Sequence, residues 1–149
     1  MSDKVRNKYF AQLINRLLRF YWFFRRPKTM GVKVIIFNQE NKILMVRLTY
    51  YPNTWTFVGG GFDKKEKPEE AILRECEEEV GIKLKEIDFV TTLYFNHEYK
   101  KDTLFVYKTT VNNSAFEIDR KEIAEANWFD LSDLPNMGKN AKKILETVI

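Results

Sequence analysis

Cysteine is almost absent from this chain of 149 residues, which contains Cys76 alone. A single cysteine excludes an internal disulfide bond, and it also excludes a metal centre built from several thiolates. This cysteine usage suits a reducing compartment, so we expect a cytoplasmic protein.

Long hydrophobic runs are missing as well. The apolar run near the N-terminus extends only from Phe20 to Phe24, whereas a membrane-spanning helix needs about 20 apolar residues. Arginines flank this run and no small-residue cleavage site follows it, so neither a spanning helix nor a signal peptide is expected. Because repeats and low-complexity linkers are also absent, the length fits one domain with a full-sized core.

Positive charge is distributed unevenly. The first 30 residues hold eight of the 25 Lys and Arg residues but only one of the 21 acidic residues, so the remainder is mildly acidic. Residues 4–26 place apolar side chains at helical spacing, and Pro27 ends that pattern. We therefore divide the chain into an N-terminal amphipathic, basic helix over residues 1–28 and a second domain over residues 29–149.

This amphipathic segment has three interpretations. Its apolar stripe suits packing on its own domain or on a second subunit of a homodimer, which is the simplest interpretation. Its aromatic residues and arginines also suit an anionic membrane surface. Its basic face could instead follow the phosphate backbone of a nucleic acid.

The rest of the chain alternates between strand and helix patterns. Strand-like segments cover residues 32–37, 43–48, 87–95, 103–111 and 126–129, with a short extended piece at 55–58. Residues 38–41 are expected to connect a hairpin, and residues 49–54 to form a loop. Helices are expected from Pro68 to Val80, ended by Gly81, and over residues 139–148. This order indicates helices packed on a mixed sheet.

The helix expected over residues 68–80 carries an acidic face. Glu75, Glu78 and Glu79 share about a third of its circumference. Like charges at these spacings destabilise a helix by about 0.2–0.5 kcal/mol per pair, and a bound divalent cation would remove that repulsion. Magnesium prefers such oxygen ligands. An ordinary solvated acidic face is the alternative.

The neighbouring face of the same helix is apolar. We expect four side chains of this face to point into the core, namely Ile72, Leu73, Cys76 and Val80. The thiol of Cys76 is therefore expected to be buried and inert rather than nucleophilic.

Residues 60–82 resemble the Nudix box, the pattern Gly-x5-Glu-x7-Arg-Glu-U-x-Glu-Glu-x-Gly-U with U a bulky apolar residue. The matching residues are Gly60, Glu66, Arg74, Glu75, Glu78, Glu79, Gly81 and Ile82. Three positions depart from common family usage: Cys76 fills the first U position, Val58 replaces a frequent proline before the glycines, and Lys65 replaces a frequent glycine. The similarity covers about residues 30–135.

The resemblance implies a set of metal ligands and catalytic residues. Glu78 and Glu79 would be the main ligands of Mg²⁺, or of Mn²⁺ in its place. Glu75 would bind a further ion or act as the base that activates water. A backbone carbonyl of Gly59 or Gly60 would complete the metal's inner shell.

Three further residues take supporting roles through the same resemblance. Arg74 would orient the carboxylates through a bidentate contact, and Glu66 would support the loop or bind through water. Glu122 corresponds to a position that supplies an extra ligand or base in some family members.

Residues just before the glycine turn, which covers residues 59–61, are candidates for binding a small-molecule nucleotide. Tyr50, Tyr51 or Trp55 could stack on a nucleobase, although core packing suits Trp55 equally well. Arg47 could contact a substrate phosphate or be a surface strand residue.

The resemblance implies a Nudix-like α/β/α sandwich and a Mg²⁺-dependent pyrophosphohydrolase. Its substrate would be a nucleoside diphosphate linked to another moiety: a nucleotide sugar, a nucleoside triphosphate or a dinucleoside polyphosphate. The alternatives are an RNA 5′-end pyrophosphohydrolase and a non-catalytic module that senses a nucleotide. Retention of every glutamate of the box favours catalysis.

Overall fold

The computed structural model describes residues 14, 28–62, 64–97 and 100–149. The amphipathic helix expected over residues 1–28 lies almost wholly outside these residues, so the proposed division at residue 28 stays a prediction. The chain forms two compact units, Met1–Thr29 with Tyr94–Thr103, and Met30–Leu93 with Leu104–Ile149. Within the first unit, the Thr29 hydroxyl donates a hydrogen bond to the Asp102 carboxylate. The second unit contains the candidate site. In the part of the chain that is described, no helix has the length and apolarity needed to cross a membrane.

The helices and strands follow the predicted order. They are β1 (Lys28–Phe37), β2 (Ile43–Leu48), β3 (Tyr51–Thr56), α2 (Pro68–Val80), β4 (Asp88–His97), β5 (Lys100–Thr110), β6 (Ile123–Phe129) and α3 (Lys139–Leu145). The loop predicted over residues 49–54 is wrong in part, because Tyr51 already pairs with Leu48 across a bulge in β2. Pro52 is tolerated there because β3 is an edge strand.

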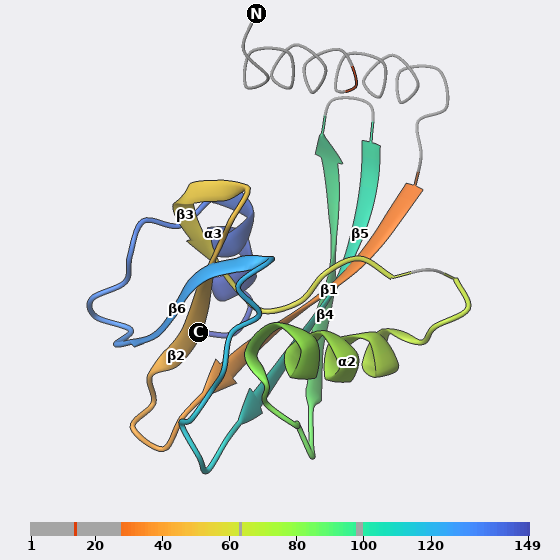
Figure 1. The fold of residues 1–149 in the computed structure, drawn as a ribbon. Coiled ribbons are helices and arrows are strands. Elements are labelled where there is room, and N and C mark those ends of the chain that lie inside the picture. Colours follow the sequence, from red (N-terminus) through yellow and green to blue (C-terminus); the bar gives the residue numbers. More distant parts are fainter. Residues whose placement is uncertain (1–13, 15–27, 63, 98–99) are drawn as a thin grey trace, which may run out of the picture. The chain divides into compact units, whose positions relative to one another are not determined.

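The strands form a mixed sheet, as predicted. Their order is β3-β2-β1-β5-β4, and β6 also pairs with β2. Strand β2 is antiparallel to β1, β3 and β6. The neighbouring strands β1 and β5 run in the same direction (Figure 1). The Val111 N–H donates a hydrogen bond to the Phe37 carbonyl (2.8 Å) where both strands end.

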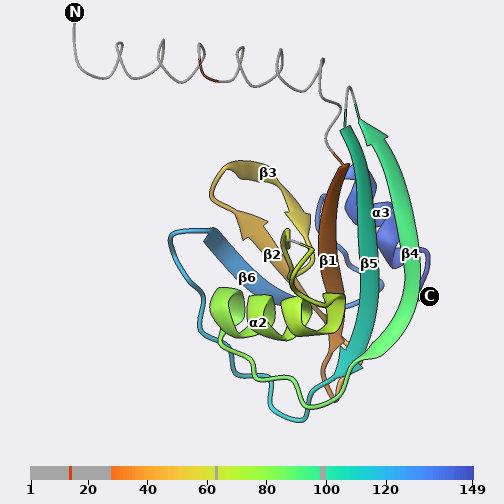
Figure 2. The same ribbon diagram turned by 90° about the vertical axis from the view of Figure 1, so that its right-hand side faces the viewer.

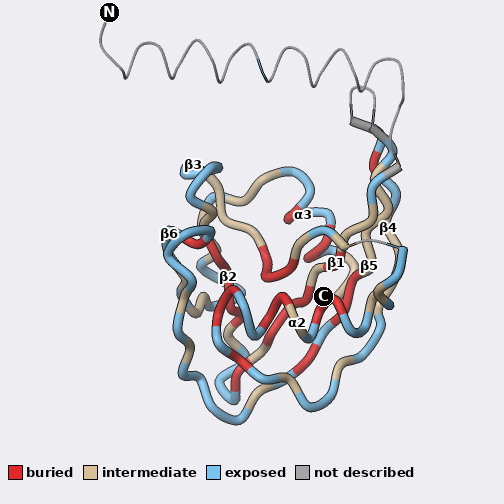
Figure 3. Tube along the Cα trace, turned by 45° about the vertical axis from the view of Figure 1, so that its right-hand side comes forward, coloured by how far each residue is buried: buried red, intermediate tan, exposed pale blue. Residues whose placement is uncertain are grey.

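One helix packs on each face of this sheet (Figure 2). On one face, Ala71, Ile72, Cys76 and Val80 of α2 pack on alternate residues of the central strands, including Val32. On the other face, Ala141, Ile144 and Leu145 of α3 pack on the intervening residues. Because side chains alternate between the faces of a strand, β1 and β2 are buried on both sides (Figure 3). This arrangement confirms the predicted α/β/α sandwich.

Helix α2 has the predicted boundaries, because local signals define both ends. Pro68 occupies its first position, and the Glu70 carboxylate accepts a hydrogen bond from the Lys67 N–H (3.2 Å). At the other end, Gly81 adopts a left-handed conformation with φ of 67°. Its N–H donates to the Glu77 carbonyl (3.1 Å), which is a glycine-dependent helix stop. Because both ends of α2 are defined in this way, the positions of its glutamates along the helix are fixed relative to the sheet.

The predicted apolar face of α2 is wrong at one residue. Leu73 is 37% exposed, whereas Ile72, Cys76 and Val80 are fully buried. Ala71 takes the remaining buried place, so the helix is rotated slightly from the orientation that the apolar pattern predicted.

This difference between adjacent residues gives a matched test of the packing. Ile72→Ala is expected to lower the free energy of unfolding by about 2–5 kcal/mol, because it leaves a cavity beneath the helix. Leu73→Ala removes a similar aliphatic side chain from the same helix but is expected to cost less than about 1 kcal/mol. Urea unfolding of both variants measures the difference, and equal losses would contradict the observed rotation of α2.

Candidate active site

The glycine turn and the residue before it run alongside β1 and are held to it by backbone hydrogen bonds. The Val34 N–H donates to the Val58 carbonyl (3.0 Å), and the Val32 N–H donates to the Gly60 carbonyl (2.9 Å). Gly59 between them has φ of 130°, and a Cβ atom there would lie 2.1 Å from the Val32 carbonyl oxygen. Close approach to β1 therefore requires glycine at residue 59.

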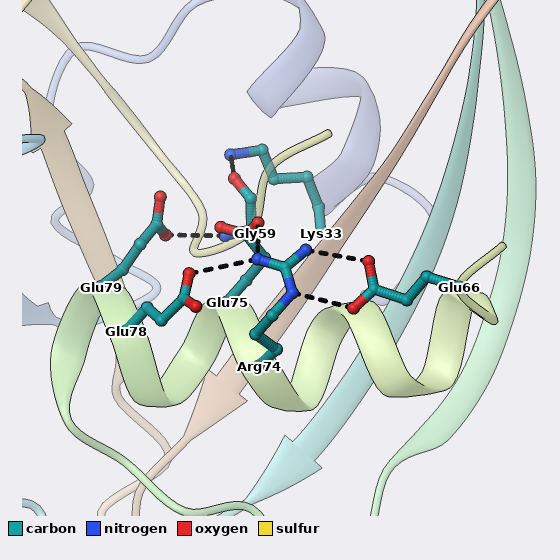
Figure 4. Close-up of polar contacts among 7 residues, drawn as sticks. All are labelled: Lys33, Gly59, Glu66, Arg74, Glu75, Glu78 and Glu79. Carbon is teal, nitrogen blue, oxygen red and sulfur yellow. Dashed lines mark hydrogen bonds and ion pairs between the residues drawn. The ribbon is translucent and has the colours of Figure 1, made fainter. Parts of the chain in front are cut away.

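Glu79 links the end of α2 to this turn. Its carboxylate accepts a hydrogen bond from the Gly59 N–H (2.9 Å; Figure 4), and the residue is only 4% exposed. Burial raises the pKa of Glu79 to about 7; Lys33 and the Gly59 N–H oppose this rise, while Glu75 and Glu122 add to it. The site thus holds a carboxylate that is costly to ionise without a further cation.

Arg74 binds three more carboxylates, Glu66 before the helix and Glu75 and Glu78 on it. Its guanidinium binds Glu66 through two parallel hydrogen bonds, Nε to Oε1 (2.8 Å) and Nη2 to Oε2 (3.0 Å). Its Nη1 donates to Glu75 (2.7 Å) and to Glu78 (3.1 Å; Figure 4). The contacts with Glu66 first, and with Glu75 after it, raise the pKa of Arg74, and Arg74 in turn lowers the pKa of Glu66.

A loop from the far side of the helix brings further carboxylates to the site. The Asp119 N–H donates to the Glu79 carbonyl (3.0 Å), and the Glu122 N–H donates to the Asp119 carbonyl (3.2 Å). The Thr49 N–H then holds the Glu122 carbonyl (2.9 Å) at the end of β2. Helix and loop border an open cavity of about 350 Å³, lined by Arg74, Glu75, Glu78, Glu79, Asp119 and Glu122.

The carboxylate oxygens of this cavity are suitable ligands for a hard divalent cation. Their present arrangement does not form a metal site. Within residues 28–62, 64–97 and 100–149, no three carboxylate, imidazole or thiol groups converge closely enough to hold an ion. Arg74 explains this arrangement, because it draws Glu75 and Glu78 toward its guanidinium. All anionic donors are oxygens, which are the ligands that Mg²⁺ prefers. Binding an ion would require carboxylates to turn away from Arg74.

The backbone carbonyls expected to complete a metal shell already have partners. The Gly60 carbonyl accepts from the Val32 N–H. The Gly59 carbonyl accepts from the Lys33 side chain, with 2.6 Å between Nζ and the oxygen. Either oxygen retains a second lone pair, so the predicted role of the glycine carbonyls stays a prediction.

The predicted substrate-binding residues lie on β2 and β3, and two of them contribute to the local packing. The Trp55 ring packs edge-on against Phe129, with 4.8 Å between ring centroids. Arg47 lies 6.0 Å from the centre of the Trp55 ring and forms an ion pair with Glu125 (2.6 Å). Tyr51, in contrast, is 67% exposed.

Two residues near the site, Asp119 and Lys33, were not assigned to it from sequence. Tyr50, already a stacking candidate, does not line the cavity, and its pKa is raised by burial first and then by the carboxylates of Glu122 and Glu79. Asp119 lines the cavity, but no local motif marks it. Lys33 did carry a signal, since it is a single charge within the apolar run of β1.

The family model described as NUDIX domain matches residues 27–148. NAD-capped RNA hydrolase NudC from Salmonella heidelberg (strain SL476) is 28% identical over 127 residues, which are 83% of this chain and 49% of that protein. The chain thus spans about half the length of the curated relatives it matches.

Solved structures show the same fold. A MutT NUDIX hydrolase from Burkholderia pseudomallei superposes with a TM-score of 0.74 at 24% identity, covering 83% of this chain and 99% of that one. A UDP-X diphosphatase superposes with a TM-score of 0.66 at 28% identity, covering 81% of this chain and 61% of that one.

The buried carboxylate generates a pH-dependent prediction for the metal-free protein. The folded-state pKa of Glu79, about 7, lies above its ordinary value of 4.5. The stability linked to this group is therefore present below the ordinary pKa and lost as the pH rises through 7. Glu79→Gln keeps an acceptor for the Gly59 N–H and is expected to raise the free energy of unfolding at pH 8 by up to about 3 kcal/mol.

Urea unfolding in the presence of a chelator measures this effect. At pH 4.5 the stability of Glu79→Gln should approach that of the wild type. Glu77→Gln, on the exposed side of the helix near Lys83, provides the control and should show no such pH dependence. A loss of stability in Glu79→Gln at pH 8 would contradict the description of Glu79 as a strained buried carboxylate.

Proposed function

The chain belongs to the Nudix hydrolase family, and we propose that it is a metal-dependent pyrophosphohydrolase acting on a nucleoside diphosphate linked to another moiety. The observation that carries this proposal is the cavity in which the α2 glutamates face Glu122 and Asp119 beside the glycine turn. A diphosphate is itself strongly anionic, so an anionic cavity suits it only when cations are bound between the two.

Mg²⁺ is the proposed cofactor, and Mn²⁺ is expected to replace it. Glu75, Glu78 and Glu79 would hold the ions, because they occupy one side of the cavity and have oxygen donors only. Bound ions would neutralise the phosphate oxygens and lower the pKa of water. The raised pKa of Glu79 fits this role, because a carboxylate that is poorly compensated in the metal-free protein gains most from a cation.

Arg74 would serve as the orienting residue. Its two hydrogen bonds to Glu66 fix the plane of the guanidinium, so Nη1 presents a fixed donor to Glu75 and Glu78. If a bound ion took the place of Arg74 Nη1 at Glu78, the two hydrogen bonds to Glu66 would still hold the Arg74 side chain in position.

Glu122 is the residue we propose as the base that takes a proton from the attacking water. It is exposed to solvent, and its backbone is held from both sides by Asp119 and Thr49. Glu75, the other candidate, is 8% exposed and accepts a hydrogen bond from Arg74, which makes it less available to a water proton.

The substrate's nucleoside would lie over the β2–β3 turn. Tyr50 and Tyr51 are 65% and 67% exposed, and their rings meet edge to face with centroids 5.5 Å apart. Such a pair offers a stacking surface for a nucleobase. Arg47 and Trp55 would support this surface from below through their contacts with Glu125 and Phe129.

A capped RNA is the second candidate substrate, and one observation favours it. The NudC relatives are named NAD-capped RNA hydrolases. An NAD cap contains a pyrophosphate linkage, so NAD-capped RNA falls within the proposed reaction class.

The proposal is tested by phosphate and nucleotide release from a panel of diphosphate substrates with Mg²⁺ or Mn²⁺. The panel includes nucleotide sugars, nucleoside triphosphates, dinucleoside polyphosphates, NAD and NAD-capped RNA. Glu78→Gln is expected to lower kcat/KM by about two to four powers of ten, because it removes a negative ligand without changing the size of the side chain.

Glu77→Gln is the matched control, since Glu77 is the preceding residue and lies near Lys83 outside the cavity. It should stay within about twofold of wild type. If no panel member is hydrolysed although nucleotides bind, the chain is a sensing module rather than an enzyme. A capped RNA hydrolysed faster than NAD, with a strong salt dependence, would identify RNA as the substrate.

A further inference from the structure

The carbonyl groups of residues 57–60 alternate between two kinds of partner. Those of Val58 and Gly60 accept from the backbone of β1. Those of Phe57 and Gly59 accept from the side chain of Lys33, with Nζ 2.7 Å and 2.6 Å from the two oxygens. The Lys33 side chain thus donates to the two carbonyls, those of Phe57 and Gly59, that do not pair with the backbone of β1. A buried carbonyl left without a donor is destabilising.

Both polar groups of the Gly59 backbone are therefore held by side chains (Figure 4). Its N–H donates to the Glu79 carboxylate, and its carbonyl accepts from Lys33 Nζ. Lys33 comes from β1 and Glu79 from α2, so the Gly59 residue is fixed between the sheet and the helix. The orientation of one contact constrains the other, because both groups belong to one residue with an unusual backbone conformation.

We propose that Lys33 is a positioning residue of the active site, which holds Gly59 in the orientation that fixes the Glu79 carboxylate at the cavity. This inference rests on the proposed function, because it treats Glu79 as a metal ligand. Lys33 itself does not line the cavity, and its effect is transmitted through Gly59.

The direction of the effect separates positioning from simple electrostatics. A nearby positive charge that did nothing else would repel a divalent cation, so its removal would strengthen metal binding. A residue that holds a ligand in place has the opposite effect, because its loss leaves the ligand in several orientations. Loss of such an outer contact typically weakens metal binding by about 10–100-fold.

Lys33→Met provides the test, because methionine keeps the length of the side chain and removes its donors. Mn²⁺ binding to the full chain is measured by calorimetry. The dissociation constant is expected to rise about 10–100-fold. Lys33→Arg keeps the donors and is expected to remain within about threefold of wild type. Lys108→Met, an exposed residue of β5, makes the same change of charge away from the site and should have no effect.

A second measurement needs no metal. Hydrogen exchange of the Gly59 amide in the metal-free protein should accelerate at least about tenfold in Lys33→Met, because the hydrogen bond to Glu79 loosens. Amides in the centre of β2 report global stability, so the local effect is the acceleration of Gly59 exchange beyond any change in theirs. Unchanged Gly59 exchange, or equal or tighter Mn²⁺ binding by Lys33→Met, would overturn the inference. Faster Gly59 exchange in a protein that hydrolyses no panel substrate would support the positioning role while refuting the proposed function.

Discussion

The hydrogen bond between the Gly59 N–H and the Glu79 carboxylate joins the two elements that form the site. The glycine turn follows β1 because its carbonyls pair with that strand, and α2 is held by its own apolar side chains. Neither contact alone determines where the carboxylate lies. A buried carboxylate is costly unless it is hydrogen-bonded or paired, so this bond constrains both elements, and the raised pKa of Glu79 shows that the constraint is only partly compensated.

Arg74 compensates the remaining glutamates in the metal-free protein. One guanidinium neutralises part of the charge of Glu66, Glu75 and Glu78, and it holds each carboxylate on its own donors, so the three do not converge on one point. This explains how an acidic helix face can be stable without a cation. It also means that metal binding exchanges one set of charge pairs for another, so the net affinity depends on how well the carboxylates are positioned beforehand.

Local signals made much of this structure predictable from sequence. Pro68 and Gly81 define the ends of α2, and the spacing of its glutamates placed them beside one another. Contacts between distant segments were not predictable in this way. The pairing of Tyr51 in β3 depends on a bulge in β2, the exposure of Leu73 depends on the rotation of the helix, and the place of Asp119 depends on its hydrogen bond to the Glu79 carbonyl.

The central claim is that the α2 carboxylates give up their present partners to bind a divalent cation. Calorimetric titration of Mn²⁺ into the full chain, in buffers of different ionisation enthalpy, tests it directly. Because Glu79 with a pKa of about 7 must ionise to bind a cation, we predict release of up to about one proton per ion at pH 6 and almost none at pH 8.5. No binding at either pH, or binding without proton release at pH 6, would contradict the account.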